Sequence, residues 1–224
     1  MMKVVLIPGM DGTGRLFEPF IESAPAGLEV ITVPLIQDAA AGYIDQAQYV
    51  VDTIGDEPLV LVAESYSGMV AYNMLNIGCK NIRHIIFAAS FISSPSWMAS
   101  LARYLPVSVL KSRFVPNSIL GKILFGRFSS SKLIAVFYEA LDHVSNDVLD
   151  HRLKQIATLK YPVTPIEIPC SYIRPKDDKL VSRAALEPFS RLCHKLTVHE
   201  VDGTHFVLQT NPKQCWSLIQ GADV

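Results

Sequence analysis

The stretch LVAESYSGMV, Leu61–Val70, places two serines two residues apart at the end of an apolar run. The apolar residues indicate a buried strand, and the residues after them have helical periodicity. A residue at the apex of a sharp strand-to-helix turn is strained and needs small residues two positions before and after it. Ser65 has Ala63 and Ser67 at those positions. Ser67 would have the bulky Met69 on one side, so the sequence favours Ser65 as the apex residue and candidate nucleophile.

The composition is typical of a compact globular protein. Half of the 224 residues are hydrophobic, 18% are charged and the formal net charge is −1. These values argue against disorder and against a nucleic-acid-binding surface over the whole protein. The first apolar run is too short for a secretory signal or a transmembrane segment, so we expect a cytoplasmic protein. Four widely spaced cysteines without a C-x-x-C motif predict reduced thiols and no metal site.

Short runs rich in β-branched residues alternate along the chain with segments of helical periodicity. The predicted strands are Lys3–Pro8, Leu28–Pro34, Leu59–Glu64, Ile82–Ser90, Cys170–Pro175 and Lys195–Gly203. The predicted helices between them are Arg15–Glu22, Ile44–Ile54, Gly68–Ile77, Ala184–Leu192 and Lys213–Ile219. The first four strands are continuous apolar runs, which indicates burial on both faces. The pattern predicts an α/β fold with a mostly parallel sheet of about six strands and helices on both faces.

The long stretch between Ser90 and Cys170 contains no convincing strand. Helical patterns recur there at Trp97–Tyr104, Ser118–Phe125, Ser131–Leu141 and Asp147–Leu159. Helices inserted between two strands predict a cap over the strand ends. We therefore expect a core formed by residues 1–91 and 166–224, with a helical cap formed by residues 92–165.

Partners for Ser65 follow the last two predicted strands. A serine hydroxyl is a poor nucleophile until a base accepts its proton, and an imidazole base needs a carboxylate to fix its tautomer. His205 follows the last strand, while Asp177 and Asp178 follow the strand before it. Carboxyl ends of parallel strands meet at one edge of the sheet, where ligands bind. The chain order Ser, Asp, His suits this kind of sheet.

Four motifs at these strand ends resemble those of the α/β-hydrolase superfamily, in particular its small esterase-like members. They are IPGMDGTG at 7–14, AESYSG at 63–68, DDKLV at 177–181 and GTHF at 203–206. The elbow departs from the G-x-S-x-G pattern, because Ala63 and Ser67 replace the glycines. The resemblance implies an α/β-hydrolase fold and an acid in a D-x-x-V turn, which selects Asp178 over Asp177. It also implies that the N–H groups of Met10 and Tyr66 form the oxyanion hole, with no metal or organic cofactor.

The predicted cap combines cations with apolar residues. No Asp or Glu occurs between Ser65 and Tyr138, a span with eight cations: Lys80, Arg83, Arg103, Lys111, Arg113, Lys122, Arg127 and Lys132. One interpretation is a solvated outer face over ordinary packing. Another is an apolar acyl tunnel, lined by Trp97, Leu105, Phe114, Leu124 and Phe128. In that case Arg103, Arg113 and Arg127 would dock an anionic carrier, such as acyl carrier protein, coenzyme A or an anionic lipid.

These features predict a serine hydrolase that cleaves carboxylic esters with a short to medium acyl chain. The architecture resembles the methyl esterases that demethylate pimeloyl-carrier esters in biotin synthesis, although no motif is diagnostic of that role. A thioesterase or acyltransferase could use the same triad. Two alternatives from another class are a non-catalytic hydrolase-fold protein that binds a ligand or partner, and a binding module that docks a partner through the basic cap.

Overall fold

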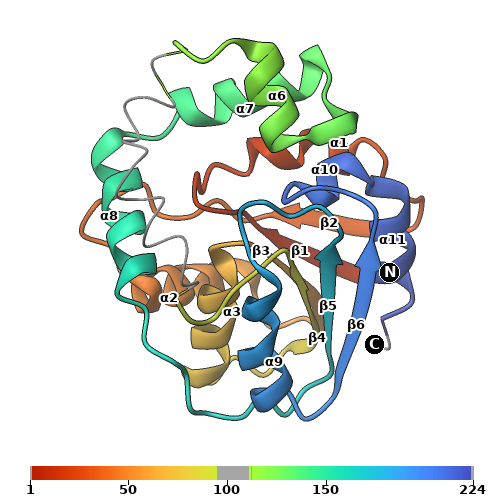
Figure 1. Ribbon diagram of the computed structural model, residues 1–224. Helices are drawn as coiled ribbons and strands as arrows, with labels where there is room; N and C mark the ends of the chain where they lie inside the picture. The colour runs from red at the N-terminus through yellow and green to blue at the C-terminus, as the bar shows by residue number, and fades with distance from the viewer. Residues whose placement is uncertain (1, 95–110, 112, 223–224) are drawn as a thin grey trace.

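A parallel β-sheet forms the centre of the computed structural model, which describes residues 2–94, 111 and 113–222 (Figure 1). Its strands are β1 (Met2–Ile7), β2 (Leu28–Thr32), β3 (Leu59–Glu64), β4 (Ile82–Ala88), β5 (Cys170–Pro175) and β6 (Leu196–Val201). The strand order is β2-β1-β3-β4-β5-β6, and every neighbouring pair is parallel. The structure confirms the predicted six-stranded α/β class.

Helices cover both faces of the sheet because the strands alternate their side chains between two apolar clusters. In β1, Val5 and Ile7 pack under one layer of helices, whereas Val4 and Leu6 pack under the other. The first layer contains α2 (Tyr43–Ile54), α3 (Ser67–Asn76) and α9 (Leu186–Leu192), with the short η3 (Arg183–Ala185) leading into α9. The second contains η1 (Arg15–Phe17), α1 (Glu18–Ile21), α10 (Val207–Thr210) and α11 (Pro212–Gln220). The sequence predicted all of these except α10.

Further helices lie between β4 and β5 in the chain. They are α6 (Asn117–Leu124), η2 (Gly126–Phe128), α7 (Ser131–Asp142) and α8 (Asn146–Ala157), called the inserted helices below. Figure 1 shows α6 and α7 at the end of the molecule toward which β5 and β6 point. The predicted helix Trp97–Tyr104 lies outside the described residues, and the division into core and cap stays a prediction.

A third apolar cluster joins the inserted helices to the rest of the protein. Leu124, Phe125 and Phe137 from these helices pack with Leu16 of η1 and with Phe206, which follows β6. The inserted helices are therefore packed against loops at the carboxyl edge of the sheet. Within the part of the chain that the structure describes, no helix is both long enough and apolar enough to cross a membrane.

Candidate active site

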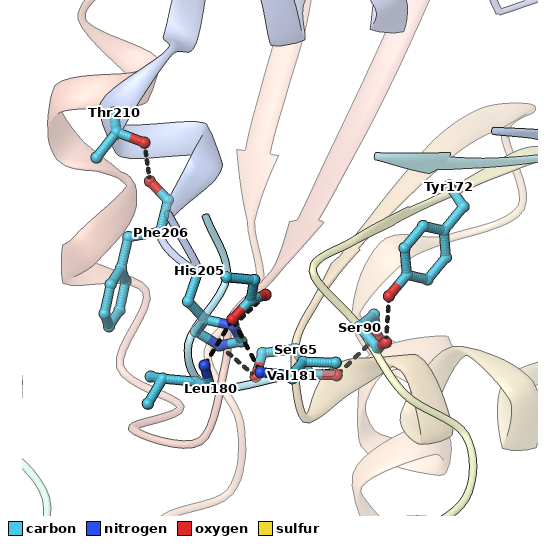
Figure 2. Close-up of polar contacts among 9 residues, drawn as sticks. Ser65, Ser90, Tyr172, Leu180, Val181, His205, Phe206 and Thr210 are labelled. Atoms are coloured by element: carbon cyan, nitrogen blue, oxygen red, sulfur yellow. Dashed lines mark hydrogen bonds and ion pairs between the residues drawn. The ribbon is translucent and has the colours of Figure 1, made fainter. Parts of the chain in front are cut away.

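The turn between β3 and α3 carries Ser65 in a left-handed backbone conformation, with a φ of 50°. A non-glycine residue in this region is strained and persists only when its surroundings hold it. The Ser65 N–H donates to the Ala88 carbonyl at 3.0 Å, and the Ser90 hydroxyl donates to the Ser65 carbonyl at 2.7 Å. The Tyr172 hydroxyl in turn donates to the Ser90 carbonyl at 2.7 Å (Figure 2). The turn is fixed by the neighbouring strands β4 and β5.

Close packing around the turn explains its small residues. A Cβ added to Gly68 would lie 2.1 Å from the Ser90 Oγ and 2.7 Å from the Phe91 carbonyl oxygen, so glycine is required there. Ser67 is fully buried, and its hydroxyl donates to the Pro8 carbonyl. Ser67 therefore holds the turn against the end of β1.

Ser65 is joined to His205 and Asp178 by two hydrogen bonds. The His205 Nε2 lies 2.9 Å from the Ser65 Oγ, and the His205 Nδ1 lies 3.0 Å from the Asp178 Oδ2 (Figure 2). A carboxylate only accepts hydrogen bonds, so the Nδ1 carries a hydrogen and the Nε2 of the neutral ring is free to accept a proton. The structure thus brings together the three side chains that the sequence selected, from the ends of β3, β5 and β6.

The turn after β5 distinguishes Asp178 from Asp177. The Asp178 Oδ1 accepts the N–H groups of Leu180 at 2.7 Å and Val181 at 2.8 Å, which leaves Oδ2 for His205. Asp177 is exposed, and its backbone N–H donates to the Gly203 carbonyl. Only Asp178 is placed to orient the imidazole.

The surroundings of His205 favour its protonated form. Burial alone would lower the pKa of His205, but the negative charge of Asp178 and the hydrogen bond to it outweigh that effect, with a further contribution from Glu64. The net pKa is raised above the ordinary value of 6.5. An imidazolium formed during a reaction would therefore be stabilised where it arises.

Glu64 is a buried carboxyl next to the nucleophile candidate, and only 4% of its surface is exposed. Burial raises its pKa to about 7, although a hydrogen bond from Gln209 and the charge of His205 act in the opposite direction. The Gln209 side-chain amide donates to the Glu64 Oε1 at 3.1 Å. Glu64, the last residue of β3, therefore faces α10, and Asp178 is the carboxylate hydrogen-bonded to His205.

The loop after β1 brings Met10 to the same edge as Tyr66. Strand β1 pairs with β3 so that Ile7 lies beside Ala63, and a Cβ on Gly9 would lie 3.6 Å from the Ser65 Cβ. Among the described residues, neither the Met10 nor the Tyr66 backbone N–H donates to a protein acceptor. Within the described part of the chain, both amides are thus without a protein acceptor.

The three predicted tunnel residues that the structure describes differ in burial. Leu124 is buried in the apolar cluster with Phe206, which directly follows His205. Phe128 is half-buried beneath the Arg127 guanidinium, 5.1 Å from the ring centroid. Phe114 exposes 86% of its surface, so it does not line an enclosed tunnel in this structure. Trp97 and Leu105 lie outside the described residues.

The two predicted docking arginines that the structure describes have carboxylate partners. Arg113 pairs with Asp142 at 2.8 Å, and Arg127 pairs with Asp202. Another cation of the same span, Lys132, pairs with Glu22. Arg103 lies outside the described residues. Three of the eight cations in this span are therefore paired with acids from other parts of the chain.

Sequence reasoning missed Arg152 in α8, which is only 1% exposed. Its guanidinium donates to the carbonyls of Met10 and Asp11 in the loop after β1. A signal was available in the sequence. Arg152 occupies the apolar stripe of its helix, four residues after Val148 and four before Ile156, where a hydrophobic residue is expected.

Comparison with known proteins identifies the family. The sequence profile of the alpha/beta hydrolase family matches residues 4–217. The chain belongs to this family. Membership confirms the resemblance drawn from the motifs, and the alpha/beta hydrolase match spans both the sheet and the inserted helices.

Solved structures share the fold of this hydrolase at low sequence identity. An esterase from Exiguobacterium antarcticum has a TM-score of 0.80 and 15% identity, over 99% of this chain and 91% of that one. An enol-lactonase from Burkholderia xenovorans has a TM-score of 0.77 and 12% identity, over 98% and 90%. A thioesterase of prodiginine biosynthesis from Streptomyces coelicolor has a TM-score of 0.69 and 18% identity, over 98% and 84%. No curated protein matches the sequence.

We predict that Glu64→Gln changes the pH dependence of stability. The folded state raises the pKa of Glu64 from 4.5 to about 7, so its favourable contribution is complete below pH 4.5 and is lost as the pH rises through 7. Urea unfolding should show the variant gaining about 3 kcal/mol over wild type between pH 4.5 and pH 8. The exposed Glu29→Gln is the matched control. The same wild-type-to-variant difference at both pH values would contradict the prediction.

Proposed function

We propose that this alpha/beta hydrolase is a serine carboxylesterase that cleaves esters with short to medium acyl chains. The observation that carries the proposal is the pair of hydrogen bonds from Ser65 Oγ to His205 Nε2 and from His205 Nδ1 to Asp178 Oδ2. A hydroxyl, a base and an orienting carboxylate in this order can form a nucleophile at neutral pH. The strained turn that presents Ser65 supports the same role.

In the first half of the reaction, the Ser65 Oγ attacks the ester carbonyl carbon while His205 Nε2 accepts the hydroxyl proton. Asp178 stabilises the resulting imidazolium, in keeping with the raised pKa of His205. The tetrahedral intermediate then breaks its bond to the alkoxy oxygen. His205 gives the proton to that oxygen, an alcohol leaves and Ser65 holds the acyl group.

In the second half, water replaces the alcohol. His205 accepts a proton from water as the oxygen attacks the acyl-enzyme, and it returns the proton to the Ser65 Oγ when the carboxylic acid departs. The N–H groups of Met10 and Tyr66 would hold the negative oxygen in both halves, and the loss of one such donor in other enzymes costs on the order of 10²–10³ in rate.

The same residues would serve related reactions. A thioester would react through the same acyl-enzyme, and an alcohol in place of water would give acyl transfer. The enol-lactonase and thioesterase among the similar structures fit this range. A non-catalytic binding protein would not need the aligned hydroxyl, imidazole and carboxylate.

We predict that a fluorophosphonate probe labels the wild-type protein and fails to label Ser65→Ala. The probe requires a nucleophilic serine, and Ser65 is the one hydrogen-bonded to His205. Hydrolysis of p-nitrophenyl esters of graded chain length should disappear with the same substitution. Ser67→Ala is the matched control, because the Ser67 hydroxyl is held by the Pro8 carbonyl, and it should keep the labelling.

Labelling of Ser65→Ala, or labelling lost only in Ser67→Ala, would overturn the assignment of the nucleophile. A wild-type protein that neither reacts with the probe nor cleaves any ester would instead favour the non-catalytic alternative.

A carrier-bound acyl methyl ester is the narrower substrate that the cations suggested. If Arg113 and Arg127 dock an acidic carrier, Arg113→Glu and Arg127→Glu should lower kcat/KM for an acyl-carrier methyl ester in a salt-dependent way. Cleavage of a p-nitrophenyl ester should stay unchanged. Both arginines already pair with acids in this structure. Equal changes in kcat/KM for the two substrates, or no change for either, would reject docking at this surface.

A further inference from the structure

Arg152 is a buried cation held by backbone carbonyls. Its Nη1 donates to the Met10 carbonyl at 2.7 Å and the Asp11 carbonyl at 2.9 Å, and its Nη2 donates to the Ile36 carbonyl at 2.8 Å. Among the described residues it forms no ion pair with a carboxylate. A guanidinium stays protonated at any working pH, and its burial is costly unless hydrogen bonds compensate it. The carbonyls of two loops supply that compensation.

These contacts fix the backbone on both sides of Met10. The Gly9 carbonyl, in the peptide group that carries the Met10 N–H, accepts the Gly12 N–H at 3.0 Å. The next carbonyl, that of Met10 itself, accepts Arg152. Since both peptide planes are held, the direction of the Met10 N–H is also set. Glycine at position 12 lets the Arg152 guanidinium come this close to the loop, because a Cβ on Gly12 would lie 2.4 Å from the Arg152 Nη1.

The same face of α8 also contacts Tyr66. Gln155 lies three residues after Arg152, which places both side chains on one side of the helix. The Tyr66 hydroxyl donates to the Gln155 Oε1 at 2.6 Å, and the Gln155 Nε2 donates to the Ala41 carbonyl at 3.3 Å. The Arg152 guanidinium lies 5.7 Å from the centroid of the Tyr66 ring. One helix face therefore contacts both Met10 and Tyr66, the two residues proposed to supply the oxyanion-binding amides.

We propose that α8 completes the oxyanion hole, with Arg152 as the residue that positions the Met10 N–H and Gln155 as its counterpart for Tyr66. This inference rests on the proposed function, in which those two amides bind the developing oxyanion. It makes an inserted helix part of the catalytic framework, since the loop after β1 depends on a side chain from between β4 and β5. Arg152 acts through Met10 and does not touch the substrate.

The test compares Arg152→Met, Arg152→Lys and the control Lys154→Met, which removes an exposed cation from the same helix. Each protein is measured with a p-nitrophenyl ester, and kcat is divided by the fraction of sites that react to completion with excess fluorophosphonate. We expect Arg152→Met to lower kcat per site about 10²-fold, because displacing a hydrogen-bond donor by about 1 Å from the oxyanion lowers the rate by about that factor. KM should stay within about twofold, since the oxyanion forms only in the transition state.

The kcat per site of Arg152→Lys should lie between those of wild type and Arg152→Met. Lysine keeps the positive charge but lacks the planar guanidinium, whose several N–H groups reach separate carbonyls. Lys154→Met should match wild type. A trifluoromethyl ketone, which forms a tetrahedral adduct, should bind Arg152→Met more weakly by about the same factor as the loss in kcat/KM. A purely structural role for Arg152 would lower the reactive fraction and the melting temperature while leaving kcat per site and ketone affinity unchanged, and that result would overturn the inference.

If Arg152→Met does not fold, Gln155→Leu and Tyr66→Phe supply the test. Each removes one end of the same hydrogen bond, so they should lower kcat per site by similar factors, and the double variant should be no worse than either alone. Unchanged kcat in both would overturn the inference. Ser65→Ala separates the two proposals: if it is inactive while the α8 variants behave like wild type, only the role of α8 fails. If Ser65→Ala stays active, the proposed function fails.

Discussion

The left-handed backbone of Ser65 is the constraint on which the rest of the site depends. A side chain in this conformation is unfavourable, and the surrounding structure must over-determine it. Ser90 and Tyr172 form a relay of hydrogen bonds from β5 to the turn, and Gly68 lets α3 start close to β4. The turn places the Ser65 Oγ at the carboxyl edge of the sheet. The loops after β5 and β6 bring Asp178 and His205 to the same edge.

Several polar side chains around this turn form hydrogen bonds with groups from distant parts of the chain. Asp178 divides its two oxygens between a backbone turn and His205, while Glu64 turns to Gln209. Arg152 uses carbonyls from two loops in place of a carboxylate. Low local dielectric strengthens such contacts and penalises any that are lost. Three sets of polar contacts therefore lie around the turn, and one of them comes from the inserted helix α8.

Much of the fold could be predicted because strands buried on both faces are continuous apolar runs, as Leu59–Glu64 illustrates. Ser65 followed from the size of its neighbours, and His205 from its place after the last strand. The choice between Asp177 and Asp178 came from the family resemblance. Composition and spacing do not show which of two adjacent aspartates directs its side chain toward His205, because that depends on the path of the backbone. The ion pair of Arg127 with Asp202 joins residues far apart in sequence, so local charge counting overstated the free positive charge. An apolar pattern also does not say which side chain remains exposed, as Phe114 illustrates.

The central claim is that a carboxylate, an imidazole and a hydroxyl act as one unit. The most direct measurement is kcat for Asp178→Asn beside its neighbour Asp177→Asn, with the same ester. Because an amide at position 178 would favour the wrong tautomer of His205, we predict that Asp178→Asn lowers kcat about 10⁴-fold and that Asp177→Asn keeps near wild-type turnover. Full turnover in Asp178→Asn, or a large loss only in Asp177→Asn, would contradict it.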